Sequence, residues 1–82
     1  MNQQEIVALI QEAIEEVAPG KGQNVDPNNL DMAIRDAGID SVASMEMAGV
    51  IEEELGVAFA DEDLNAVQSF KDLVKMVQKT QG

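Results

Sequence analysis

The sequence predicts an all-α fold, a small bundle of three main helices plus one short helix. Apolar residues recur at steps of three and four, which is the period of an amphipathic helix. Hydrophobic residues make up 45% of the chain, and only Phe59 and Phe70 among them are aromatic. The rest are aliphatic or Met, a composition that suits packed helices. We find no strand signal.

The length of the chain, 82 residues, predicts one domain over 1–82, near the lower size limit for a single core. The chain has no Cys, so no disulfide can compensate for a small core. Packing alone must stabilise the fold.

A first helix is predicted over 3–18, ended by Pro19 and Gly20. One apolar stripe defines it: Ile6, Leu9, Ile10, Ala13, Ile14 and Val17. A long loop follows. Within it, Asp26 and Pro27 resemble an N-cap and a first helical position. They predict a short helical turn that carries Leu30 and Ile34 before Gly38.

A second helix is predicted to begin at Asp40 or Ser41 and to end at Leu55, with Gly56 as a left-handed stop. Its expected core face is Met47, Val50, Ile51 and Leu55. Val42, Met45 and Gly49 lie on a neighbouring line of the helix. A helix that is apolar over so wide an arc usually contacts something on two sides.

Two further helices are predicted after Gly56. A short one covers about 61–66, and a last one covers about 70–79 with Ser69 as its cap, three residues before Asp72. Its inner face is Phe70, Leu73, Val74 and Val77, and its outer face carries Lys71, Lys75 and Lys79.

Charge limits the partners. Sixteen acidic residues oppose five basic ones, for a net charge of -11. Nucleic acid and anionic membranes are therefore poor partners. Arg35 and Lys71 enclose nine acidic residues and no basic one. This segregation indicates a basic protein partner, although solubility alone also explains the total charge.

The location follows from hydropathy. The first sixteen residues lack the basic start and apolar run of a signal peptide. No apolar run reaches the length needed to span a bilayer. We expect a cytoplasmic monomer without a membrane span.

Most catalytic chemistry is excluded. Without His or Cys, the chain lacks the usual general base and the usual transition-metal ligands, so we predict that it is not an enzyme. The nearest match to a calcium-binding loop begins at Asn24, but Asn29 stands where glycine is needed and Arg35 where a bidentate Glu is needed. We predict no metal site.

The stretch 38–56, GIDSVASMEMAGVIEEELG, contains residues that stability alone does not explain. Asp40 and Ser41 are both good helix caps, which is the structural explanation. A hydroxyl at a helix start is also a favourable place for a phosphate ester. Gly49 costs roughly 0.5 to 1 kcal/mol relative to Ala, so it indicates either close helix packing or a function that needs space.

The acidic run Glu52 to Glu54 stands at the helix C-terminus, where the helix dipole disfavours negative charge. We expect folding to gain nothing from this arrangement. A solvated face is one explanation. A face kept for a basic partner accounts better for its position after Ser41.

This stretch, followed by DEDL at 61–64, resembles the attachment motif of the acyl carrier protein family, and the likeness extends over about 1–80. The resemblance implies that a phosphopantetheinyl transferase esterifies Ser41 with 4'-phosphopantetheine, and that Asp40 belongs to the motif which that enzyme recognises. The thiol of the added arm would carry acyl chains as thioesters. The implied docking face for enzymes with basic surfaces is Val42, Met45, Glu46, Gly49, Glu52, Glu53 and Glu54.

Three positions depart from the family pattern. Val42 replaces a leucine, Gly49 stands where a bulkier apolar residue often docks, and Ala60 replaces a common proline. The stretch around Ser41 is closer to carriers of polyketide or other dedicated pathways than to a fatty-acid carrier. Two alternatives remain open: an unmodified acidic module that binds a basic protein, and a carrier of aminoacyl or peptidyl groups.

Overall fold

The computed structural model describes residues 1–81, and its helices confirm the predicted all-α class. They are α1 (Gln3–Val17), α2 (Ser41–Leu55), α3 (Asp61–Ala66) and α4 (Phe70–Gln81). Two 3-10 turns, Gly22–Asn24 and Ile34–Ala37, lie in the long loop. Among the described residues there is no strand, only an isolated bridge between Ala33 and Ser69.

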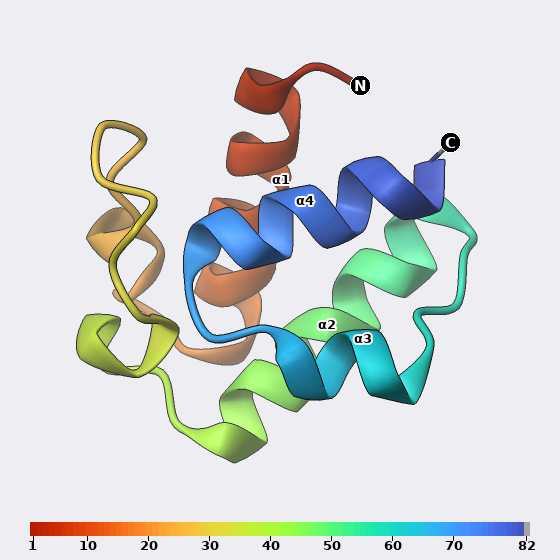
Figure 1. Cartoon of the computed structure of the whole chain (residues 1–82). Helices are drawn as coiled ribbons and strands as arrows, with labels where there is room; N and C mark the ends of the chain where they lie inside the picture. The colour runs from red at the N-terminus through yellow and green to blue at the C-terminus, as the bar shows by residue number, and fades with distance from the viewer. Residues whose placement is uncertain (82) are drawn as a thin grey trace.

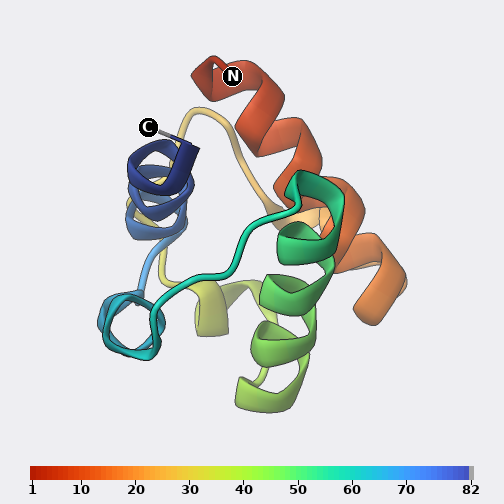
Figure 2. The same ribbon diagram turned by 90° about the vertical axis from the view of Figure 1, so that its right-hand side faces the viewer.

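The core lies where α1 contacts both α2 and α4 (Figure 1). Its largest fully buried side chains are Phe70, Ile6, Ile10, Ile14, Met47, Ile51, Leu73 and Val77. Helix α3 contributes no buried residue and lies beside α4, as both views show (Figures 1 and 2). The short helix is therefore a cover over the bundle rather than part of its core. No helix in residues 1–81 is long and apolar enough to cross a membrane.

Helix α1 begins with a capping box that the sequence reading did not identify. The Asn2 side chain accepts from the Glu5 backbone N–H, and the Glu5 carboxylate accepts from the Asn2 N–H, both at 2.9 Å. Such reciprocal bonds satisfy backbone donors that a helix start leaves free. The helix ends at Val17, one residue before the predicted end. Val7 is buried as well, so the apolar stripe is wider than predicted.

The prediction of a helical turn beginning at Asp26 is wrong. The Asp26 carboxylate accepts from the Asn28 N–H at 2.8 Å, which makes a local turn instead of capping a helix. The helical turn forms later, at Ile34–Ala37, and Gly38 ends it with a φ of 85°. Leu30 therefore lies outside the turn, whereas Ile34 lies in it as predicted.

Backbone hydrogen bonds fix this loop to the start of α4. The Ile34 N–H donates to the Gln68 carbonyl at 2.9 Å, and the Lys71 N–H donates to the Leu30 carbonyl at 2.7 Å. Loops usually lie free on the surface. This one is held to the start of α4, so the segment that enters α2 has a defined position.

Helix α4 begins at Phe70 as predicted, with the expected cap. The Asp72 N–H donates to the Ser69 hydroxyl at 3.1 Å, and the Asp72 carboxylate accepts from the N–H groups of Gln68 and Ser69 at 3.1 and 3.2 Å. These bonds favour the charged carboxylate. The pKa of Asp72 is therefore below its ordinary value. The largest cause is the hydrogen bond from the Gln68 N–H, followed by that from the Ser69 N–H. The charge of Lys75 contributes less, and burial acts in the opposite direction.

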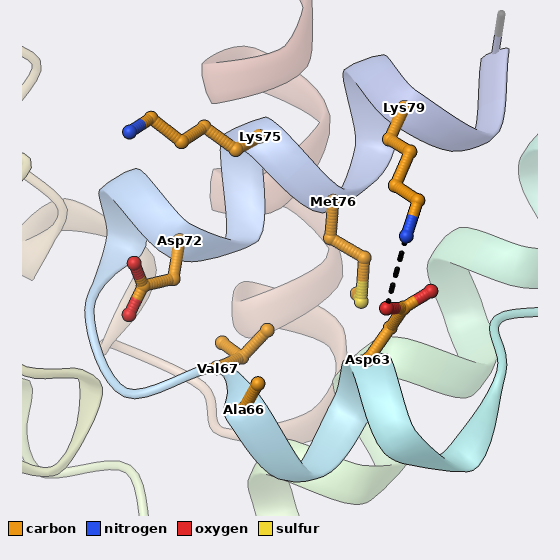
Figure 3. Close-up of a pocket in the computed structure, with 7 residues that line it drawn as sticks. All are labelled: Asp63, Ala66, Val67, Asp72, Lys75, Met76 and Lys79. Carbon is orange, nitrogen blue, oxygen red and sulfur yellow. Dashed lines mark hydrogen bonds and ion pairs between the residues drawn. The ribbon is translucent and has the colours of Figure 1, made fainter.

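An ion pair connects α3 to α4. The Lys79 Nζ lies 3.3 Å from the Asp63 carboxylate (Figure 3). Figure 3 also shows Lys75 pointing away from Asp63, near the end of α4 that carries Asp72. Exposed pairs of this kind are worth about 0 to 1 kcal/mol. The pair therefore orients α3 more than it stabilises the fold.

Gly49 does not mark a helix contact. It is exposed, and apart from its own helix backbone no atom lies within 4 Å of the place that a Cβ would take. Of the two explanations of this glycine, close packing is excluded. Its cost in helix stability is not offset by any contact in the described chain.

We expect Gly49→Ala to raise the free energy of unfolding by about 0.5 to 1 kcal/mol, because alanine has the higher helix propensity and meets open space. Urea unfolding followed by circular dichroism measures the change. The matched control is Gly56→Ala, also in open space but at a φ of 65°, which should lower stability. A loss of stability in Gly49→Ala would contradict this account.

We expect Asp72→Asn to destabilise the fold at pH 7 by about 1 kcal/mol, because a neutral amide accepts the hydrogen bonds of the Gln68 and Ser69 N–H groups less strongly than a carboxylate does. The folded pKa of Asp72 lies below its ordinary value of 3.8, so its contribution is present above that pH. The contribution disappears as pH falls through the folded pKa. Unfolding curves of the two proteins should therefore converge in acid, and a difference that stays constant down to pH 2 would refute the assignment.

Candidate functional site

Asp40 alone caps α2. Its backbone is extended, with φ of -77° and ψ of 179°, and its side chain accepts from the Ala43 N–H at 2.8 Å. Ser41 is the first residue of the helix itself. Its hydroxyl is exposed and forms no hydrogen bond with any residue in 1–81. Capping therefore explains Asp40 and leaves the Ser41 hydroxyl free for chemistry.

The residues just before Asp40 place this hydroxyl at the surface. Gly38 takes a left-handed conformation that turns the chain after the 3-10 turn. Ile39 is then buried at 2% exposure, whereas Asp40 and Ser41 are both exposed. The buried Ile39 anchors the turn in the core, so Ser41 projects from a fixed backbone.

A groove of about 610 Å³ lies beside the Ser41 hydroxyl, and we call it the Ser41 groove. Its lining combines apolar side chains with one cation, one carboxylate, hydroxyls and an amide. The lining residues are Ala33, Ile34, Arg35, Ile39, Asp40, Ser41, Ser44, Val67 and Gln68. Such a mixed surface fits a flexible chain that is itself part polar and part apolar.

A second groove of about 300 Å³ lies between α2, α3 and α4, and we call it the α2–α4 groove. It shares Ser44 and Val67 with the Ser41 groove, so the two adjoin. Its remaining residues are Met45, Met47, Ala48, Glu52, Leu64, Asn65, Leu73 and Met76. Three methionines make the lining adaptable. Ala48 lines this groove, whereas Gly49 does not.

The structure brings most of the predicted docking residues onto one outer face of α2. Val42 and Met45 are 66% and 76% exposed, which is unusual for large apolar side chains. Helical spacing places Glu46, Gly49 and Glu53 beside them, because residues three and four apart share a face. The outer face is thus Val42, Met45, Glu46, Gly49 and Glu53, an apolar patch bordered by carboxylates.

The acidic run does not act as one unit. Adjacent residues on a helix differ in direction by about 100°, so three consecutive acids cannot share a face. The Glu52 carboxylate accepts from the Phe59 N–H at 2.7 Å and is partly buried. The prediction that folding gains nothing here is therefore wrong for Glu52, which holds the loop after α2. Glu54 is exposed but points away from the outer face.

Sequence reasoning missed Arg35 and Gln68, which line the Ser41 groove. Arg35 was considered as a misfit in a calcium loop and as one end of the acidic stretch, but not as part of a site. No spacing rule brings either residue to Ser41, because their approach depends on the contact between the long loop and the start of α4.

Comparison with known proteins agrees with this geometry. Residues 4–77 match the family described as the phosphopantetheine attachment site. The chain is 37% identical to the meromycolate extension acyl carrier protein of Mycolicibacterium aurum, over 95% of this chain and 78% of that protein. It is 40% identical to the granaticin polyketide synthase acyl carrier protein of Streptomyces violaceoruber, over 74% and 72%.

A third relative is the acyl carrier protein of Rhodococcus erythropolis, 30% identical over 98% of this chain and 86% of that one. No solved structure gives a significant match. The family match covers nearly the whole chain and includes the stretch around Ser41. These carriers are not themselves catalytic, in agreement with the absence of His and Cys from this sequence. The chain therefore belongs to the phosphopantetheine-attachment family, as an acyl carrier protein.

Proposed function

We propose that Ser41 is the residue that carries 4'-phosphopantetheine. One observation supports this assignment above the others: the Ser41 hydroxyl is exposed and unbonded at the helix start, while Asp40 supplies the cap. The other serines are less suited. Ser44 is partly buried, and the Ser69 hydroxyl is engaged by the Asp72 N–H.

The arm, when bound, supplies the thiol that this chain lacks, and acyl chains are held on it as thioesters. The protein's own residues present the hydroxyl and shape the surface around it. Asp40 fixes the backbone before Ser41 and offers a charged contact next to it, which fits recognition by a phosphopantetheinyl transferase. The Ser41 groove provides a surface of matching polarity for the arm.

We propose that partner enzymes dock on the outer face of α2. The exposed pair Val42 and Met45 would supply apolar contact, and Glu46 and Glu53 would pair with basic side chains around it. Charged rims of this kind act mainly on the rate of encounter. Gly49 leaves room between the two parts of the face. Glu52 is less suited to this role than Glu46 and Glu53, because its carboxylate already accepts from the Phe59 N–H.

The α2–α4 groove is the place where we propose that the acyl chain is sheltered. It adjoins the Ser41 groove at Ser44 and Val67, so a chain tethered at Ser41 lies close to it. Its lining includes the polar side chains of Ser44 and Asn65 beside the methionines. Hydroxyl and amide groups can pair with oxygen atoms on a cargo.

This lining supports a dedicated pathway in which enzymes extend an acyl chain that still carries oxygen atoms. Carriers named for polyketide synthesis and for meromycolate extension are among the relatives, and both names describe the building of chains. We propose a carrier of this kind, in which polyketide-type intermediates are the favoured cargo and simple fatty acyl chains are the alternative.

We expect incubation with coenzyme A and a phosphopantetheinyl transferase to add one arm to the protein, and Ser41→Ala to abolish the addition. Intact mass spectrometry measures both. The matched control is Ser44→Ala, one turn along the same helix, which should load normally. Loading that persists in Ser41→Ala would contradict the assignment of this residue.

We expect the double reversal Glu46→Lys and Glu53→Lys to slow loading and to flatten its dependence on salt. Steering between exposed charges is screened beyond about 8 Å at physiological ionic strength, so the native rate should fall as salt rises. The control reverses Glu12 and Glu16, exposed acids on α1, for an equal change of net charge. Equal slowing by both pairs would show that total charge, rather than the outer face, controls docking.

A further inference from the structure

Among the described residues that line the Ser41 groove, Arg35 is the only basic one. It lies in the 3-10 turn Ile34–Ala37, whose position is fixed by the hydrogen bond from the Ile34 N–H to the Gln68 carbonyl. The Arg35 side chain is exposed. The turn thus places Arg35 on the lining of the same groove as the hydroxyl that we propose for attachment.

Among residues 1–81, Arg35 forms no ion pair, a state that it shares with Lys21 and Lys75. With a net charge of -11, carboxylates are abundant, and Lys71 and Lys79 pair with Asp31 and Asp63 at 3.8 and 3.3 Å. Arg35 forms no ion pair with any residue in 1–81, although Asp40 lines the same groove. The Asp40 carboxylate is directed to the Ala43 N–H instead. The charge of Arg35 therefore remains available to a group from outside the chain.

We propose that Arg35 binds the phosphodiester of the arm attached at Ser41 and so directs the arm along the Ser41 groove. The inference rests on the proposed attachment at Ser41. A guanidinium presents several N–H donors in a planar fork, which matches the oxygens of a phosphate group. A phosphodiester on Ser41 also lies next to the Asp40 carboxylate, whose repulsion a nearby cation offsets.

The rest of the groove suits the remainder of the arm. Pantetheine contains amides, a hydroxyl and a dimethyl-substituted carbon. Ser44 and Gln68 offer hydrogen-bonding groups, whereas Ile39 and Val67 offer apolar surface. Since Ser44 and Val67 also line the α2–α4 groove, an arm held at its phosphate by Arg35 is aimed toward that groove. Arg35 is thus a positioning residue for the arm and its cargo.

The test uses the full chain in its loaded form, with the arm added enzymatically and loading confirmed by intact mass. The transverse relaxation of the single ³¹P signal reports how firmly the phosphodiester is held. We expect Arg35→Gln to lower the ratio of held to free arm by a factor of about 1.5 to 5, the range for exposed charge pairs. The ³¹P signal should then sharpen, and Arg35→Lys should retain part of the effect.

Lys75→Gln is the control, because it removes one positive charge from an exposed side chain of α4 that does not line the Ser41 groove. It should leave the ³¹P relaxation unchanged. Equal ³¹P relaxation in the wild type and in Arg35→Gln would overturn the role of Arg35 but not the attachment at Ser41. A change of ³¹P relaxation in Lys75→Gln as large as that in Arg35→Gln would overturn the role of Arg35 as well. Failure of the wild-type chain to gain an arm would overturn the attachment at Ser41, and this inference with it.

Discussion

The hydrogen bond between the Asp40 carboxylate and the Ala43 N–H is the interaction on which the account of this protein depends. It begins α2 at Ser41 and satisfies the helix start without using the serine hydroxyl. The buried Ile39 fixes the backbone on the other side. Together these two residues present a free hydroxyl on a rigid support, which is what a site of covalent attachment requires.

Helix α2 packs one face into the core and exposes apolar side chains on its outer face, and the exposed side chains lower the stability that the buried ones provide. Met47 and Ile51 are fully buried, whereas Val42 and Met45 are exposed where folding alone would favour polar side chains. Gly49 and Glu53 also lower helix stability, and neither gains a compensating side-chain contact or hydrogen bond that the structure describes within 1–81. These costs are concentrated on one outer face. Residues that lower the stability of the fold and are gathered on one surface, with no packing contact to compensate, are typical of a functional surface.

The sequence was sufficient for the helices, because periodic apolar positions and local caps carry that information, as at Phe70 with Ser69. The assignment of Ser41 as the attachment residue stays a prediction. It was insufficient where distant segments meet. Asp26 forms a turn rather than a helix cap, and Glu52 bonds to Phe59 across a loop. Gln68 is brought to the Ser41 groove by the contact of the long loop with the start of α4. Such contacts depend on tertiary structure, which spacing does not encode.

The most direct test of the central claim is to locate the added group on protein purified from its natural source. Fragmentation of the intact protein in a mass spectrometer assigns a modification to a single residue. The account predicts one phosphopantetheine, on Ser41, with or without an acyl chain on its thiol. A group found on Ser44, on Ser69 or on any other residue would contradict it, as would native protein that carries no such group at all.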